Sequence, residues 1–137
     1  MTDYLVDNSV WARLATGDPA ITARLRRIER APADLFVTCP PQVLEFCHSA
    51  RTPDAHANYR EQISLGFPLE RAPDESLVLD IQAALWNAGL VRAAGSHDIL
   101  IAGYAIVNDA TVLAADHDFE RIARVSDLQC EYIAPSP

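Results

Sequence analysis

The sequence has no lysine: all eleven of its permanently charged basic residues are arginine, against nineteen aspartate and glutamate residues. This absence disfavours phosphoryl-transfer sites that pair a strand-end aspartate with a lysine ammonium. A Walker P-loop and a GxGxxG sequence are also missing, so neither of these phosphate-binding loops is present to bind a nucleotide. The net charge of -8 disfavours loose attraction of nucleic acid to the surface as a whole.

Long hydrophobic runs and paired cysteines are missing as well. No apolar stretch approaches the roughly 18 to 20 residues that span a bilayer, and the N-terminus lacks the positive region and apolar core of a signal peptide. Cys39, Cys47 and Cys130 form no CxxC pair, and an odd number of cysteines does not suit a disulfide framework. We therefore expect a cytoplasmic protein with reduced, buried thiols and no membrane contact.

The residues that are present predict one globular α/β domain over residues 1–137. Half of the 137 residues are hydrophobic and 22% are charged, which is typical of a chain with a sizeable core. Short apolar strands alternate with helical segments, and we place the strands at 4–6, 35–37, 67–69, 111–114 and 129–133. This alternation predicts βαβ units, and therefore a three-layer α/β/α sandwich with a central parallel sheet of four to five strands.

Proline and apolar spacing place the main helices. Pro40 and Pro41 open a helix that we expect to direct Val43, Leu44 and Cys47 toward the core. The longest helix is predicted to begin at Asp74 and to end near Gly89. Further helices are predicted at about 53–65, from 96 onward, and over 116–125.

Four carboxylates fall where a parallel sheet binds ligands. Asp7 and Asp116 follow predicted strands, Asp98 begins the helix that leads into the 111–114 strand, and Glu45 lies about one turn into the helix after the second strand. Ligands of open parallel sheets bind outside the carboxyl ends of the strands, where the strand order reverses. If strands 4–6 and 111–114 are neighbours at that point, all four side chains can meet in one acidic pocket.

Each of these acids also has an ordinary structural explanation. Asp7, Asp98 and Asp116 are good helix N-caps, a role worth about 1 kcal/mol each, and Glu45 alone would be a solvated helix residue. Taken together, however, four neighbouring carboxylates repel one another unless a cation or a shared proton relieves the repulsion. Mg²⁺ takes oxygen ligands of this kind, and no His/Cys cluster indicates zinc.

The acidic segments resemble the ordered motifs of PIN-domain ribonucleases. The matching segments are Asp7-Asn8-Ser9, Glu45, Asp98-Ile99-Leu100-Ile101-Ala102 and the stretch from Leu113 to Phe119. Length and spacing are most similar to the VapC toxins of bacterial toxin–antitoxin pairs, and the resemblance covers nearly the whole chain. Its most specific part is D-x-x-I-A, followed about 18 residues later by D-x-D-F.

The resemblance implies an Mg²⁺- or Mn²⁺-dependent endoribonuclease toxin that cleaves RNA such as tRNA or rRNA and is inhibited by a cognate antitoxin. It implies that Asp7 and Asp98 are the main metal ligands, that Asp116 is a further ligand, and that Glu45 binds the metal or orients water. Ser9 would place a hydroxyl beside Asp7, and Asp118 would be a peripheral acid. One position departs from the pattern, since Ala114 stands where family members often carry a threonine or serine that contacts the fourth acid.

Other candidate residues are assigned by position. Arg51 and Arg92 are closest in sequence to the acidic segments and are our candidates for RNA phosphate contacts. We interpret Arg24, Arg26, Arg27 and Arg30 as a solvated helix face paired with Glu29, with an RNA-backbone contact as the alternative. His97 and His117 are expected at the pocket edge. Trp11 and Trp86 have core spacing and are predicted to pack internally or in a homodimer contact.

Two other functions remain open. One is a PIN-like module that has lost activity and acts only by binding a partner; the complete set of four acids argues against it. The other is a haloacid-dehalogenase-like phosphatase, which the absence of lysine disfavours.

Overall fold

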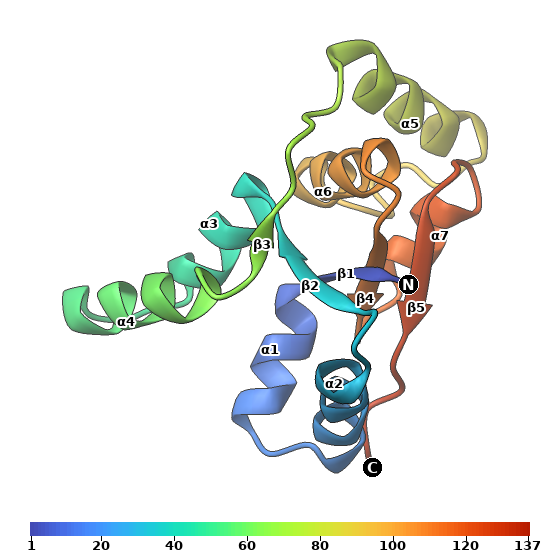
Figure 1. Ribbon diagram of the computed structural model, residues 1–137. Helices are drawn as coiled ribbons and strands as arrows, with labels where there is room; N and C mark the ends of the chain where they lie inside the picture. Colours follow the sequence, from blue (N-terminus) through green and yellow to red (C-terminus); the bar gives the residue numbers. More distant parts are fainter.

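The computed structural model describes residues 1–137 and has a five-stranded, all-parallel sheet at its centre (Figure 1). The strand order is β3-β2-β1-β4-β5. The strands are β1 (Asp3–Val6), β2 (Leu35–Thr38), β3 (Phe67–Pro68), β4 (Thr111–Ala114) and β5 (Gln129–Tyr132). The predicted parallel sheet is confirmed, and β1 and β4 are neighbours in it.

Helices cover both faces of the sheet, so the predicted three-layer sandwich is confirmed (Figure 1). One face carries α1 (Asn8–Ala15) and α2 (Pro19–Arg30). The other carries α5 (Glu75–Asn87), α6 (Ser96–Val107) and α7 (Asp118–Ala123). The remaining helices, α3 (Pro40–His48) and α4 (Pro53–Ile63), project beyond the β3 edge of the sheet as an arm.

The central strand β1 explains why the strands appear in the sequence as unbroken apolar runs. Leu5 packs into the larger core with α5, α6 and α7, whereas Tyr4 and Val6 pack into the smaller core with α1 and α2. Alternate residues of a strand point to opposite faces, and both faces are covered here, so Tyr4, Leu5 and Val6 are all buried.

Several helix starts follow from local sequence. Pro19 and Pro53 occupy first-turn positions, where a missing backbone N–H costs nothing. Asp18 caps α2 by accepting from the Ala20 and Ile21 N–H groups, and Thr52 caps α4 through the Ala55 N–H.

The root of the arm is held by a buried side chain that the sequence did not single out. Gln42, in the first turn of α3, donates its Nε2 to the Val6 carbonyl oxygen at 2.7 Å. Its Oε1 accepts from the Cys39 N–H at 3.3 Å. This glutamine therefore ties the start of the arm to the end of the central strand.

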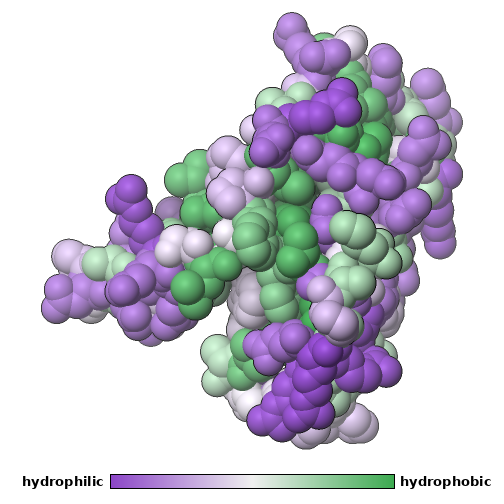
Figure 2. Space-filling model, in the orientation of Figure 1, coloured by the Kyte–Doolittle hydropathy of each residue, from purple (hydrophilic) through white to green (hydrophobic).

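The prediction that Leu44 faces the core is wrong, since the side chain is 66% exposed. The inner side of α3 packs against α1 and α6, where Cys47 is buried, whereas Leu44 lies on the outer side of the helix and has no layer to pack against. Leu65 and Phe67 are exposed nearby at 85% and 58%. Figure 2 shows a hydrophobic surface where the arm meets the β3 edge.

A paired charge cluster joins α2 to the far edge of the sheet. Arg24 donates to both carboxylate oxygens of Glu131, at 2.6 and 2.9 Å, and to the Tyr4 hydroxyl at 2.9 Å. The predicted pairing of Arg24 with Glu29 is therefore wrong, because Arg24 lies on the side of α2 that faces β5 rather than solvent.

No helix of the structure is both long and apolar enough to cross a membrane.

Candidate active site

The site begins at the carboxyl end of β1, which lies between β2 and β4. Asp7 follows this strand, is only 4% exposed, and caps α1 by accepting from the Ser9 N–H at 3.1 Å. Its other oxygen, Oδ1, is buried and has no hydrogen-bond partner. A buried carboxylate oxygen left without a donor is costly, so Asp7 has one oxygen available for a ligand.

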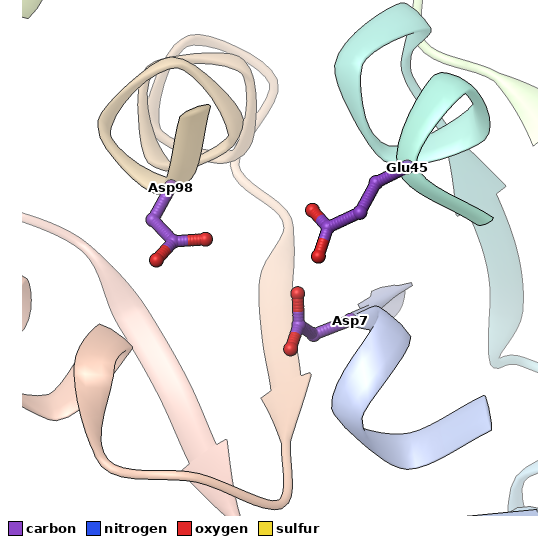
Figure 3. A group of neighbouring side chains, drawn as sticks. All are labelled: Asp7, Glu45 and Asp98. Carbon is purple, nitrogen blue, oxygen red and sulfur yellow. The ribbon is translucent and has the colours of Figure 1, made fainter. Parts of the chain in front are cut away.

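Two further carboxylates point toward Asp7 (Figure 3). Glu45 comes from α3 and Asp98 from the first turn of α6, and one oxygen from each of the three residues lies within 4.8 Å of the others. No arginine is paired with any of them. The only basic side chain in contact is His97, whose Nε2 is 3.5 Å from Glu45 Oε2.

The three carboxylates disfavour one another's ionisation. The pKa of Asp98 is raised to about 7, first by burial and then by the charges of Asp7, Asp118, Glu45 and Asp116. Burial also raises the pKa of Asp7, an effect that hydrogen bonds from Ser9 oppose. The pKa of Glu45 is raised first by burial and then by the Asp7 charge.

This donor set fits a hard divalent cation. Three carboxylates converge, one of them with an unpartnered buried oxygen, and no thiol or imidazole contributes to the group. Mg²⁺ is bound in proteins by a few carboxylates and retains several waters, so three oxygen ligands are sufficient for it. A cation among them would also remove the repulsion that raises their pKa values.

The fourth predicted acid, Asp116, lies outside this group of three. Its Oδ1 accepts from the Asp118 N–H at 3.2 Å, while its charge raises the pKa values of Asp7, Glu45 and Asp98. Asp118 is paired with Arg121 at 3.0 Å. The structure therefore brings three of the four predicted acids together, with Asp116 at the margin.

The alternative interpretation of Asp98 and Asp116 as N-caps is wrong. The N-cap of α6 is Gly95, which places Asp98 at the third helical position, and the N-cap of α7 is His117. Of the four predicted acids, only Asp7 is an N-cap, and it combines this role with its place in the acidic group. Capping therefore does not account for Asp98, whose local effect is limited to placing a negative charge in the first turn of α6, where the helix dipole favours it.

Ser9 connects the two strands that lead to the site. Its hydroxyl oxygen accepts from the Ala115 N–H at 3.0 Å, and its own N–H donates to Asp7. The start of α1 is thereby fixed to the residue just before Asp116. Although Ala114 provides no hydroxyl, Ser9 anchors the same stretch of backbone from the first turn of α1.

His97 has a contact that the sequence could not show. Its Nε2 lies 2.6 Å from the Pro41 carbonyl oxygen, in addition to its contact with Glu45. The histidine thus joins the first turn of α6 to the first turn of α3. Its position beside Asp98 was the only available signal, since Pro41 and Glu45 are more than 50 residues away in the chain.

The remaining candidates lie around this group. Arg51 is exposed and lines a cleft of about 650 Å³ that Asn8 also lines. Arg92 is exposed in the turn before α6, with a φ of 59°. His117 pairs with Glu120 at 2.7 Å, and its ring lies 4.3 Å from that of Tyr132.

Known proteins share this sequence pattern and this fold. The PIN domain family matches residues 4–125. Ribonuclease VapC11 of Mycobacterium tuberculosis (strain H37Rv) is 31% identical over 134 residues, covering 91% of this chain and 95% of that protein. Ribonuclease VapC21 of the same strain is 32% identical, with 96% and 94% covered.

Solved structures agree on the fold. VapBC-1 from nontypeable Haemophilus influenzae aligns with a TM-score of 0.72 at 20% identity, covering 96% of this chain and 98% of that chain. VapBC-5 from Mycobacterium tuberculosis, described as a member of the VapBC family of toxin-antitoxin systems, aligns with a TM-score of 0.67 at 16% identity, covering 97% and 100%. In each alignment both chains are covered almost completely, so the similarity extends over the whole sandwich and its arm. This chain belongs to the PIN-domain family and, within it, to the VapC ribonucleases.

Proposed function

We propose that this protein is a divalent-cation-dependent endoribonuclease in which Asp7, Glu45 and Asp98 hold Mg²⁺ or Mn²⁺. The observation that carries the proposal is the convergence of three carboxylates, one with an unpartnered buried oxygen, at the carboxyl end of the central strand. Asp116 is proposed as a fourth acid that adds negative charge at the margin, and Asp118 as a peripheral one.

When bound, the cation would lower the pKa of a coordinated water and offset the charge of the attacked phosphodiester. The protein's own groups set the geometry of the site. Asp7 is fixed by its N-cap hydrogen bond, which leaves Oδ1 directed to the pocket. Glu45 is positioned by α3, whose first turn His97 contacts at the Pro41 carbonyl oxygen. Asp98 has a pKa near neutrality in the absence of a cation, so it can hold a proton until a cation binds.

The same proposal includes an antitoxin partner and an RNA substrate. The curated relatives are named ribonucleases, and the similar solved structures are of VapBC proteins, one of them described as a member of a family of toxin-antitoxin systems. We propose that this chain acts in the cytoplasm as a toxin that cleaves RNA, with tRNA and rRNA as candidate substrates, and that a cognate antitoxin inhibits it. A homodimer is part of the proposal. Arg51 and Arg92 are predicted to contact RNA phosphates.

The test is RNA cleavage by the purified protein with Mg²⁺, with Mn²⁺ and with EDTA. We expect cleavage with either cation, none in EDTA, and loss of cleavage in Asp98→Asn. The matched control is Asp80→Asn, which neutralises an exposed aspartate on α5. Cleavage in EDTA, or full activity of Asp98→Asn, would overturn the mechanism.

The inactive-module alternative predicts a different result from the same preparation. It predicts that Mn²⁺ binds but that no RNA is cut under any condition. Expression without a partner is the corresponding test in cells: a toxin arrests growth, whereas Asp98→Asn does not.

A further inference from the structure

A second feature lies beside the carboxylates: a cleft of about 650 Å³ between α1, α3 and α4. Its wall includes Asn8, the residue after Asp7, and Phe46, the residue after Glu45. The cleft therefore adjoins the acidic group along two of the three helices that supply it. A cleft of this volume is within the range of small-molecule sites.

Three aromatic rings from three different helices form a continuous row in this cleft. The Trp11 and Phe46 rings are 6.1 Å apart in an edge-to-face arrangement, and the Phe46 and Tyr59 rings are 5.2 Å apart. All three side chains line the cleft and are only partly buried. Core aromatics would be covered, whereas these rings retain surface on which a planar ligand can stack.

The charge of the cleft is opposite to that of the protein. Arg51 is the only charged residue that lines it, and its guanidinium makes no ion pair or hydrogen bond. The chain as a whole carries a net charge of -8. An unpaired arginine in a cleft without acids favours an anionic ligand, and Asn8, Ser49 and Gln62 add polar groups that can contact base edges.

We infer that this cleft binds a nucleotide of single-stranded RNA next to the bond that is cut, with its base on the Phe46–Tyr59 rings and a backbone phosphate on Arg51. Aromatic stacking combined with an arginine is how proteins hold single-stranded nucleic acid. An apolar protein segment would also fit the rings, but it would leave the unpaired guanidinium without a function. The inference rests on the proposed ribonuclease activity, and it adds where the substrate lies and which side chains select it.

Cleavage of a random-sequence RNA pool tests this, with the cut ends read by sequencing. We expect wild type to show a base preference at one position flanking the cut, and Tyr59→Ala to flatten the preference at that position. Stacking loss of this kind predicts a rise in KM of roughly 10-fold, with a smaller change in kcat. Tyr59→Phe should retain the wild-type profile, because it keeps the ring and removes only the hydroxyl. Arg51→Ala should raise KM and weaken its dependence on salt.

Direct binding separates this inference from the proposed activity. The same pool, fluorescently labelled, is titrated into Asp98→Asn protein with Mg²⁺, where no cutting is expected. Tyr59→Ala and Arg51→Ala in this background should each weaken binding several-fold. The matched controls are Trp86→Ala, an exposed aromatic on α5, and Arg60→Ala, an exposed arginine on the same arm.

Unchanged RNA affinity in both cleft variants would overturn the inference even if wild type cleaves RNA. Equal losses in the controls would also overturn it, since the effect would then not belong to the cleft. Weakened binding confined to the cleft variants would support it even if cleavage itself failed.

Discussion

The charged clusters at the two ends of β1 differ in whether their charges are paired. Near the start of the strand, Tyr4 belongs to a cluster in which the Arg24 guanidinium and the Glu131 carboxylate make two hydrogen bonds to each other. Just past its end, Asp7 lies with Glu45 and Asp98, and no arginine or lysine is paired with any of the three. The two clusters are separated by only a few residues of one strand.

The two clusters differ in whether an opposite charge compensates the charge of each member. The Glu131 carboxylate raises the pKa of Arg24, so the folded protein stabilises the charged form of this guanidinium. In the second cluster the pKa values of all three acids are raised, so folding works against their charge. The paired cluster contributes to stability, whereas the unpaired one lowers stability unless a cation is bound.

The largest expected effect comes from removing one charge of the unpaired cluster. Asp7→Asn keeps the N-cap, because asparagine caps helices as well as aspartate does, but it removes the buried negative charge. We expect RNA cleavage to fall by more than about 100-fold while the melting temperature in EDTA does not decrease. Activity within a few-fold of wild type would show that Asp7 is only a cap.

In the paired cluster, removing a charge should lower stability and leave the cation site unaffected. Arg24→Ala leaves Glu131 and Tyr4 without their donor, and we expect a loss of about 2 kcal/mol in the free energy of unfolding, measured with urea. Cation affinity should be unchanged. Arg30→Ala, an exposed arginine at the end of the same helix, is the control; if both variants are equally stable, the cluster does not hold α2 to β5.

His97 provides a finer test of the comparison, since it is the one basic contact of the unpaired cluster. His97→Ala should weaken Mn²⁺ binding by roughly 10-fold, as the loss of a group that orients a ligand does. His97→Gln should recover most of this affinity, because the amide can still donate to the Pro41 carbonyl oxygen. Equal losses in the two variants would show that orientation of Glu45 does not depend on this bond.

The smallest expected effect is on the pH dependence of stability in EDTA. The folded-state pKa of Asp98 is about 7, above its ordinary value of 3.8, so the folded state retains a proton that the unfolded chain has lost. Stability from this group is therefore present at low pH and falls as pH rises from about 4 to 7.

Between pH 5 and pH 8 we expect a loss of about 1 kcal/mol, since solvent screens a half-buried carboxylate. Thermal unfolding in EDTA measures it, with Asp98→Asn as the variant that should lack this slope. Saturating Mg²⁺ at pH 8 should restore the lost stability. A slope that persists unchanged in Asp98→Asn would place the titration on another group.

The sequence predicted those parts of the molecule that depend on local pattern and on the logic of parallel sheets. Apolar strands and helix spacing predicted the layered fold. The strand-end rule, applied to Asp7 and Asp116, predicted one acidic pocket that also holds Glu45 and Asp98, and the structure brings Asp7, Glu45 and Asp98 together. The D-x-x-I-A segment placed Asp98 on a helix whose buried side packs in the core, which fixes the direction of its carboxylate.

Contacts between distant elements could not be predicted in this way. Leu44 has the spacing of a core residue, but it lies on the outer side of α3, and only the tertiary arrangement shows that this side is not covered. The sequence predicts that Arg24 pairs with Glu29 on the same helix, whereas its partner in the structure, Glu131, is 107 residues away. His97 and Gln42 were missed as contacts for the same reason, since each bonds a carbonyl oxygen in a distant segment.

The arm has a consequence for how the site can be controlled. Asp7 and Asp98 belong to helices packed on the sheet, whereas Glu45 belongs to α3, which the Gln42 and His97 bonds tether at its first turn. The acidic group is thus divided between the sheet-packed body of the protein and the arm. A molecule that grips the outer part of the arm would shift one carboxylate relative to the other two, and so alter the affinity for a cation without entering the pocket.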